Sequence, residues 1–305
     1  MSRAALDLDM VQSALSQQIT KLESELATRL LHRSPQGVTP TEAGLAFYRE
    51  AQLTLRHADQ AVRAAQQARL SGSVTVGLAP TTSAVLGLPL MLAMRTRYPD
   101  VRLHMVESMS GHLGDMLNAR QLDLAVLFDS RRYLQDTSAD KRRWQVQALL
   151  EEDLYLIRAR RTPAPSLPNP LPQTLRMTAL KNEPLILPTG SHGLRSTLDA
   201  AFARAKLVPQ VVMEVDSLSM LMAAVDAGMG ATVQPWAALG RHPDAAQRFE
   251  IARITDKQVQ RVNLLCSLSE DELSPAALAA RVVLKDCVKS LIQTQAWTGA
   301  RLQTD

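Results

Sequence analysis

The sequence predicts an α+β protein of several domains, with a small N-terminal unit, one long helix and a two-lobed α/β domain. Residues 1–40 alternate short helical patterns with turn residues, and residues 41–70 contain no proline and only one glycine. From Ser73 to about Ser267, predicted strands alternate with predicted helices. We therefore expect domain boundaries near residues 40 and 70, with residues 71–305 forming the large domain.

The composition is that of a globular protein. The 305 residues are 46% hydrophobic and 21% charged, which suits two or three domains at about 100–200 residues each. No segment approaches the roughly 20 apolar residues that span a membrane, and the N-terminus has no apolar signal core. Cys266 and Cys287 are too few for a disulfide framework or a thiolate metal site. We expect a cytoplasmic protein without a membrane partner.

The charge of the chain permits nucleic-acid binding without establishing it. The formal net charge is +4, yet residues 1–70 hold eight Lys/Arg and seven Asp/Glu. Any contact with phosphate must therefore come from where individual basic side chains lie, and not from bulk charge.

A predicted helix that begins near Ser13 has one apolar face and one polar face. Leu15, Ile19, Leu22 and Leu26 follow helical spacing. Short polar side chains near its N-terminal end suit a helix that reads base edges in the DNA major groove. These candidate DNA-binding residues are Gln12, Ser13, Ser16, Gln17, Thr20 and Lys21. The alternative, which spacing alone leaves open, is a solvated helix face.

A hairpin is expected to follow this helix. The turn residues Pro35 to Gly37 separate two short segments, as a wing requires. Arg33 at the base of this wing is a candidate phosphate contact. Thr41 is expected to cap the long helix that comes next.

The long helix would extend about 45 Å over about 30 residues. Large and small apolar residues alternate along it in a heptad pattern with small residues at one position, so two such helices can approach closely. The candidate dimerisation residues are Tyr48, Ala51, Leu55, Ala58, Val62 and Ala65. A helix packed on its own core is the alternative, but so narrow a stripe favours a partner chain.

The large domain reads as two β-α-β-α-β units joined by crossing strands. The first unit begins with a strand at Ser73–Ala79, and the second with a strand at Leu185–Leu187. The chain would pass from one unit to the other near Gln147–Leu156 and back near Phe249–Ile254. These two connections would give a clamshell of the periplasmic-binding-protein type. We expect one lobe over about 73–148 and 255–305, and the other over about 153–250.

Hydroxyl-rich and glycine-rich loops follow three of the predicted strands. In open α/β sheets, ligands bind at the carboxyl ends of strands, where helix N-termini offer free N–H groups. We therefore expect a cleft that binds a small effector, an anion such as a carboxylate being suited to these donors. The candidate effector-binding residues are Thr81, Thr82, Ser83, Ser108, Ser110, Thr189, Ser191 and His192. Each hydroxyl alone also fits a helix cap.

Several segments resemble the signature of the LysR family of bacterial transcription regulators, in the family's order and spacing. They are Ala4-Ala5, Ser13–Ile19, Leu22-Glu23, Leu30–Arg33 and Val38–Gly44. The resemblance covers nearly the whole chain, and the segments Leu70–Val74, Val76–Pro80, Gln121–Val126 and Glu152–Leu156 are most similar to nitrogen-assimilation-control regulators. It implies a winged helix-turn-helix, a dimerisation helix and an effector-binding domain.

The chain departs from the family pattern at its start. The resemblance implies a full helix before the one that opens here, so we expect the winged helix-turn-helix to lack its first helix. That helix would cover Leu6, Leu8, Leu15 and Ile19, whose burial is worth roughly 1.5–3 kcal/mol each. We expect the 305-residue form to bind double-stranded DNA weakly if the chain truly starts at Met1.

The sequence favours a regulator over an enzyme or a transport protein. The six histidines show no metal-ligand spacing, and no phosphate-binding loop or nucleophile elbow is present. We expect no cofactor and no metal. A solute-binding protein of the clamshell type remains the alternative, but it would need a signal peptide and would not carry residues 1–70. The expected partners are double-stranded DNA, a second copy or three further copies of the chain, and a small effector.

Overall fold

The computed structural model describes residues 4–5, 10–34, 37–66, 70–128, 144–160, 171–190, 193–240, 242, 244–256, 259–270 and 272–303. It divides the chain into two compact units, residues 1–66 and residues 67–305.

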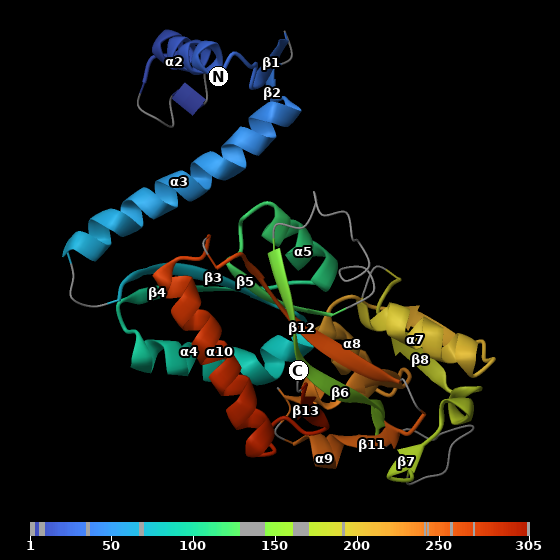
Figure 1. The fold of residues 1–305 in the computed structure, drawn as a ribbon. Coiled ribbons are helices and arrows are strands. Elements are labelled where there is room, and N and C mark those ends of the chain that lie inside the picture. The colour runs from blue at the N-terminus through green and yellow to red at the C-terminus, as the bar shows by residue number, and fades with distance from the viewer. Residues whose placement is uncertain are drawn as a thin grey trace. The chain divides into compact units, whose positions relative to one another are not determined.

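The first unit consists of a helix, a hairpin and a long helix. Helix α2 (Gln12–Glu25) is followed by strands β1 (Leu31–Ser34) and β2 (Gly37–Pro40), which pair antiparallel, and by helix α3 (Glu42–Gln66) (Figure 1). The predicted helix near Ser13, the wing hairpin and the long helix are confirmed. Of the sequence before residue 10, the structure describes only Ala4 and Ala5, which are helical.

One carboxylate fixes the hairpin to α2. Glu23 Oε1 accepts hydrogen bonds from the backbone N–H groups of Leu30 and Leu31, at 2.8 and 3.0 Å. These backbone bonds hold the pKa of Glu23 below its usual value. Thr41 caps α3, because its Oγ1 accepts a bond from the N–H of Gly44 at 2.9 Å. A Cβ at Gly44 would lie 2.0 Å from the carbonyl oxygen of Leu30, so α3 begins directly against the chain that precedes the hairpin.

The second unit begins with a parallel β-α-β-α-β arrangement. Strand β3 pairs parallel with both β4 and β5, and the helices between them supply the apolar side chains that cover this sheet. The elements of this first lobe are β3 (Gly72–Leu78), α4 (Pro80–Arg97), β4 (Val101–Glu107), α5 (Ser110–Asn118) and β5 (Leu124–Phe128).

The second lobe repeats this pattern further along the chain. Strands β8 and β9 pair parallel, and two apolar clusters surround the sheet of this lobe. Its elements are β7 (Thr174–Leu175), η1 (Met177–Leu180), β8 (Pro184–Leu187), α7 (Gly193–Arg204), β9 (Gln210–Glu214), α8 (Leu218–Asp226), β10 (Thr232–Pro235), η2 (Trp236–Leu239), α9 (Ala245–Arg248) and β11 (Phe249–Ile254).

A single long strand, β6 (Trp144–Ala159), belongs to both lobes. Its residues 144–153 pair with β12 (Gln260–Leu268), while its residues 154–159 pair with β10 and β11 of the second lobe. The predicted two-lobed α/β fold is therefore confirmed. Strand β6 runs through both lobes as one continuous strand (Figure 1). Its pairing passes from the first lobe to the second between Asp153 and Leu154.

The C-terminal segment returns to this shared strand. Helix α10 (Pro275–Gln293) begins at Ser274, whose Oγ accepts the N–H of Ala277, and it packs beside α4 (Figure 1). Strand β13 (Ala300–Leu302) then pairs with β6 at residues 150–152. Among the described residues, no helix is both long and apolar enough to cross a membrane.

A buried network of polar side chains surrounds Glu152 on β6. Arg261 on β12 lies directly opposite and donates to Glu152 Oε2 from Nη2 at 2.5 Å and from Nε at 3.2 Å. Asn263 Nδ2 donates to the same oxygen at 2.8 Å, and Trp297 Nε1 donates to Oε1 at 2.8 Å. Glu152 and Arg261 are only 1% and 2% exposed. Burial lowers the pKa of Arg261, and the charge of Glu152 opposes this shift.

Replacing Glu152 should destabilise the second unit strongly. Glu152→Ala leaves the buried guanidinium of Arg261 without its carboxylate, which should cost about 3–5 kcal/mol of unfolding free energy. The measurement is urea unfolding followed by circular dichroism. Glu151→Ala is the matched control, since Glu151 is partly exposed and should cost less than about 1 kcal/mol. Equal effects of the two changes would contradict a central role for Glu152.

The two thiols should be inert in the folded protein. Cys266 is fully buried and Cys287 nearly so, and burial raises the pKa of both thiols. Because the thiolate is the nucleophile and forms only at higher pH when the pKa is raised, iodoacetamide at pH 8 should leave both cysteines unlabelled. Mass spectrometry of native and urea-unfolded protein measures this, and rapid labelling of the native protein would be the contrary result.

Candidate functional site

One face of α2 carries an open, shallow groove. It is lined by Gln12, Ser13, Ser16, Gln17, Thr20 and Lys21, together with Ser24 and Glu25. The first six are the polar residues that the sequence singled out on this helix, and the structure brings all of them to one surface. All except the half-buried Ser16 are exposed. The face therefore presents hydroxyl and amide groups to whatever approaches it.

Arg33 lies against this face instead of extending away from it. Its Nη1 donates to Ser16 Oγ at 2.9 Å, and its Nη2 donates to Thr20 Oγ1 at 3.2 Å. Thr20 Oγ1 in turn donates to the carbonyl oxygen of Ser16 at 2.9 Å. The guanidinium of Arg33, on β1, is thus held over the middle of α2, and its positive charge lies next to the groove.

The outer face of α3 exposes large apolar side chains. Tyr48 is 59% and Leu55 is 68% exposed. Ala51 is half-buried and Ala58 is exposed. The side chains of Val62 and Ala65, which the heptad pattern also included, lie outside the described residues.

The second unit contains a small cavity between its two lobes. Its apolar wall is formed by Pro80, Pro188, Leu194, Val215, Leu218 and Leu221, and its polar wall by Thr81, Asp216, Gln234 and Arg261. Pro80 and Thr81 come from the start of α4 in the first lobe, and Arg261 comes from the crossing strand β12. The remaining residues belong to the second lobe. The free volume is about 20 Å³.

Of the predicted effector-binding residues in the first lobe, only Thr81 lines this cavity. Its Oγ1 accepts a bond from Arg261 Nη2 at 2.9 Å. Thr82 is fully buried and donates to Asn263 Oδ1 at 3.1 Å. Ser110 Oγ accepts the N–H of Phe128 at 3.1 Å. Ser83 and Ser108 are half-buried and are not part of the cavity wall.

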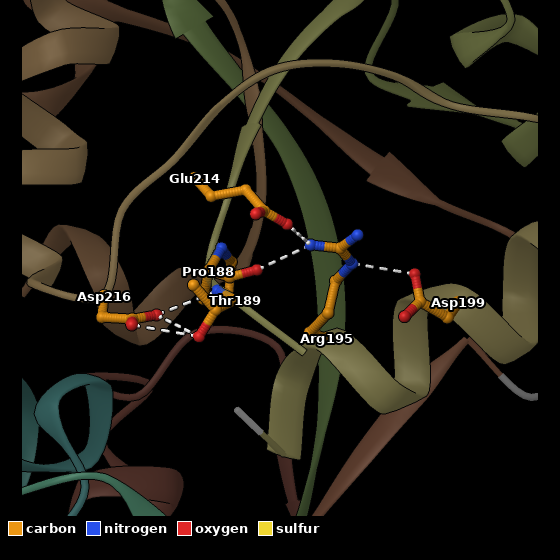
Figure 2. A network of polar contacts seen from close by, with 6 residues as sticks. All are labelled: Pro188, Thr189, Arg195, Asp199, Glu214 and Asp216. Carbon is orange, nitrogen blue, oxygen red and sulfur yellow. Dashed lines mark hydrogen bonds and ion pairs between the residues drawn. The ribbon is translucent and has the colours of Figure 1, made fainter. Parts of the chain in front are cut away.

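In the second lobe, the predicted residue Thr189 is bonded to a carboxylate of the cavity. Figure 2 shows Thr189 donating to Asp216 from its backbone N–H at 2.9 Å and from its hydroxyl at 2.9 Å. Arg195 lies beside this loop and donates to the carbonyl oxygen of Pro188 at 2.9 Å and to Glu214 at 2.5 Å. Ser191 and His192 lie outside the described residues.

Three cavity residues escaped the sequence analysis. Gln234 is an amide between buried Val233 and Pro235, and this interruption is the signal that could have identified it. Arg261 lies among other polar residues of β12, including Gln260 and Asn263, and the pattern gives it no such signal. Asp216 lies two residues beyond Glu214, the last residue of β9, near the carboxyl end of a strand, where ligand-binding residues are expected. No group of three or more His, Cys, Asp or Glu side chains that could hold a metal ion occurs within the described ranges.

Two family models match the chain, one over each unit. Residues 1–45 match "Bacterial regulatory helix-turn-helix protein, lysR family", and residues 67–287 match "LysR substrate binding domain". The second model alone spans well over half of the chain.

Named transcription regulators are among the proteins whose sequences are similar to this chain. The chain is 35% identical over 291 residues to the nitrogen assimilation regulatory protein nac of Klebsiella aerogenes, covering 94% of this chain and 90% of that protein. This match confirms the resemblance to nitrogen-assimilation-control regulators.

Solved structures share the fold. A full-length OxyR variant of Pseudomonas aeruginosa has a TM-score of 0.69 at 22% identity, covering 94% of this chain and 91% of that one. Full-length CbnR, solved in complex with its target DNA, has a TM-score of 0.58 at 20% identity, covering 94% and 93%. Together with the helix, the wing and the two lobes around a cavity, these matches show that the chain belongs to the LysR family of transcriptional regulators.

Proposed function

We propose that this regulator reads its operator with the groove face of α2 and grips the neighbouring phosphates with its wing. The observation that carries the proposal is the gathering of six polar side chains on one exposed helix face with Arg33 held over it. A helix fits the major groove, where Gln, Ser and Thr can address base edges. The similar fold of CbnR, which was solved with its target DNA, supports the same use here.

The contacts of Arg33 support a prepared binding surface. Its two bonds to α2 fix the guanidinium before DNA arrives, so less side-chain freedom is lost on binding. The clamp of Glu23 on the hairpin holds the wing at a set distance from α2. Residues 1–40 would then act as the DNA-reading part.

We assign dimerisation to the exposed apolar stripe of α3, within the linker over residues 41–70. Exposed tyrosine and leucine on one side of a helix are stabilised by burial against a partner. Two copies of the chain would place two copies of α2 on paired half-sites one or more helical turns apart.

Residues 71–305 would modulate DNA binding through a ligand held in the cavity between the lobes. Because β6 runs through both lobes, a ligand held by Thr81 of one lobe and by residues of the other changes the balance between open and closed forms. The chain acts by binding, and we propose no catalytic step. We propose that the protein works in the cytoplasm, because a regulator of transcription acts on the DNA there.

Gln17→Ala should weaken specific DNA binding about fivefold to 100-fold, because a side chain that reads base edges is worth about 1–3 kcal/mol. The measurement is fluorescence anisotropy with a duplex selected from a randomised pool. Gln18→Ala is the matched control, since Gln18 is an exposed neighbour on α2 outside the groove lining. An equal loss of DNA affinity in the two variants would contradict a role of the groove face in reading DNA.

Leu55→Asp should separate α3 from its partner helix. The proposed dimer buries Leu55, and burying a carboxylate there would oppose association. The dimer of the variant should therefore dissociate at a protein concentration at least about tenfold higher than the wild-type dimer. Sedimentation velocity over a dilution series measures this. Thr54→Asp, at the exposed neighbouring position, is the control. If the Leu55 variant associates as strongly as wild type, the apolar stripe of α3 is not the dimer interface.

A further inference from the structure

The guanidinium of Arg33 is held by hydroxyl groups and not by a carboxylate. Its Nη1 donates to Ser16 Oγ and its Nη2 donates to Thr20 Oγ1. Among the described residues, it makes these two bonds and no ion pair. The carboxylate at the base of the hairpin, that of Glu23, is bonded to backbone N–H groups instead. Hydroxyls are neutral, so they fix the position of the guanidinium and leave its positive charge available to a partner.

The hydroxyl of Thr20 is used inside the protein. Its oxygen accepts from Arg33, and its hydrogen is donated to the carbonyl oxygen of Ser16 at 2.9 Å. Because a hydroxyl carries a single hydrogen, Thr20 has none left to donate to a base acceptor such as guanine N7. The bonds therefore favour a positioning role for Thr20, in which it holds the side chain of Arg33.

Arg33 itself keeps donors for a further partner. A guanidinium has five N–H groups, and two of them are used on α2. Arg33 is exposed, so the remaining groups can meet a ligand. Parallel N–H groups of a planar guanidinium match the N7 and O6 acceptors of guanine in the major groove.

The place of the guanidinium favours a base over a phosphate. Ser16 and Thr20, which hold it, both line the groove face of α2. A side chain that contacts only phosphate needs a charge at the rim of the DNA groove, and it gains little from directed bonds onto the face that meets the base edges.

We propose that Arg33 is a specificity-determining residue that reads a guanine, and that Ser16 and Thr20 position it. This inference rests on the proposed DNA-reading function of the groove face. It changes the role of Arg33 from the phosphate contact expected from the sequence to a base contact. A phosphate contact carries no sequence information, whereas a base contact does, and so each half-site should contain a guanine that Arg33 recognises.

Replacement of guanine by 7-deazaguanine tests this contact, because the analogue lacks the N7 acceptor but still pairs with cytosine. The full chain is titrated by fluorescence anisotropy with the duplex selected from a randomised pool, and each guanine position is replaced in turn. At one position, wild type should bind at least about fivefold more weakly. Arg33→Ala should bind the unmodified duplex about fivefold to 100-fold more weakly, and the replacement at that position should then cost no further affinity.

Matched variants separate a base contact from a phosphate contact. Arg33→Lys keeps the charge but loses the planar fork, so it should also lose the response to 7-deazaguanine, whereas a phosphate contact would tolerate lysine. Thr20→Val removes the positioning hydroxyl and should reduce the response at the same guanine. Arg29→Ala changes an exposed arginine outside the groove lining and should respond like wild type. Circular dichroism checks that each variant is folded.

Four results would overturn the proposal. They are a wild-type affinity that no 7-deazaguanine changes, a full wild-type response in Arg33→Ala, an unchanged response in Thr20→Val, and undiminished guanine preference in Arg33→Lys. In each of these cases the groove face could still read DNA through Gln17, which the anisotropy assay with the Gln17 and Gln18 variants judges separately. A pool that yields no preferred duplex would contradict the DNA-reading function itself, and this inference with it.

Discussion

The carboxylate of Glu152 ties together segments of the second unit that lie far apart in the sequence. It lies on the strand shared by the lobes, and its oxygens accept bonds from Arg261, Asn263 and Trp297. Through Arg261 the network reaches Thr81 at the start of α4, and through Trp297 it reaches the C-terminal segment. Because the group is buried, breaking any of these bonds is expensive.

The DNA-binding unit uses charged side chains in a similar way. Glu23 ties the backbone of the hairpin to α2, and Arg33 ties the side of β1 to the same helix. A helix with a few partly exposed apolar residues has little core of its own, so these polar bonds define its orientation toward the wing. The surface that we propose to contact DNA is consequently built from one helix and one strand that are fixed to each other.

Periodicity predicted the fold well because each element has a clear pattern of its own. Helical spacing also placed the polar residues of α2 on one face, since residues three and four apart lie side by side on a helix. The cavity was harder to predict. The rule on strand ends pointed to three loops, of which those with Thr81 and Pro188 line the cavity and the one with Ser108 does not. It could not tell which hydroxyl turns inward, so Thr81 lines the cavity while Thr82 bonds to Asn263, 181 residues further along the chain.

The unpredicted residues depend on pairings between distant positions. Asp216 bonds to Thr189 across 27 residues, and Arg261 faces Glu152 across 109 residues. Single-sequence patterns report only which neighbours along the chain share a face, and so they carry no information on such pairs. Gln234 was more accessible to reasoning, because an amide between buried Val233 and Pro235 interrupts an apolar strand.

The most direct test of the central claim is dimethyl sulfate footprinting of the full chain on its selected operator. This reagent methylates guanine N7, which lies in the major groove. The account predicts protection of guanines in two half-sites whose centres are one or more helical turns apart, about 10 base pairs each, as two copies of α2 would produce. Binding that leaves every guanine N7 reactive would contradict it.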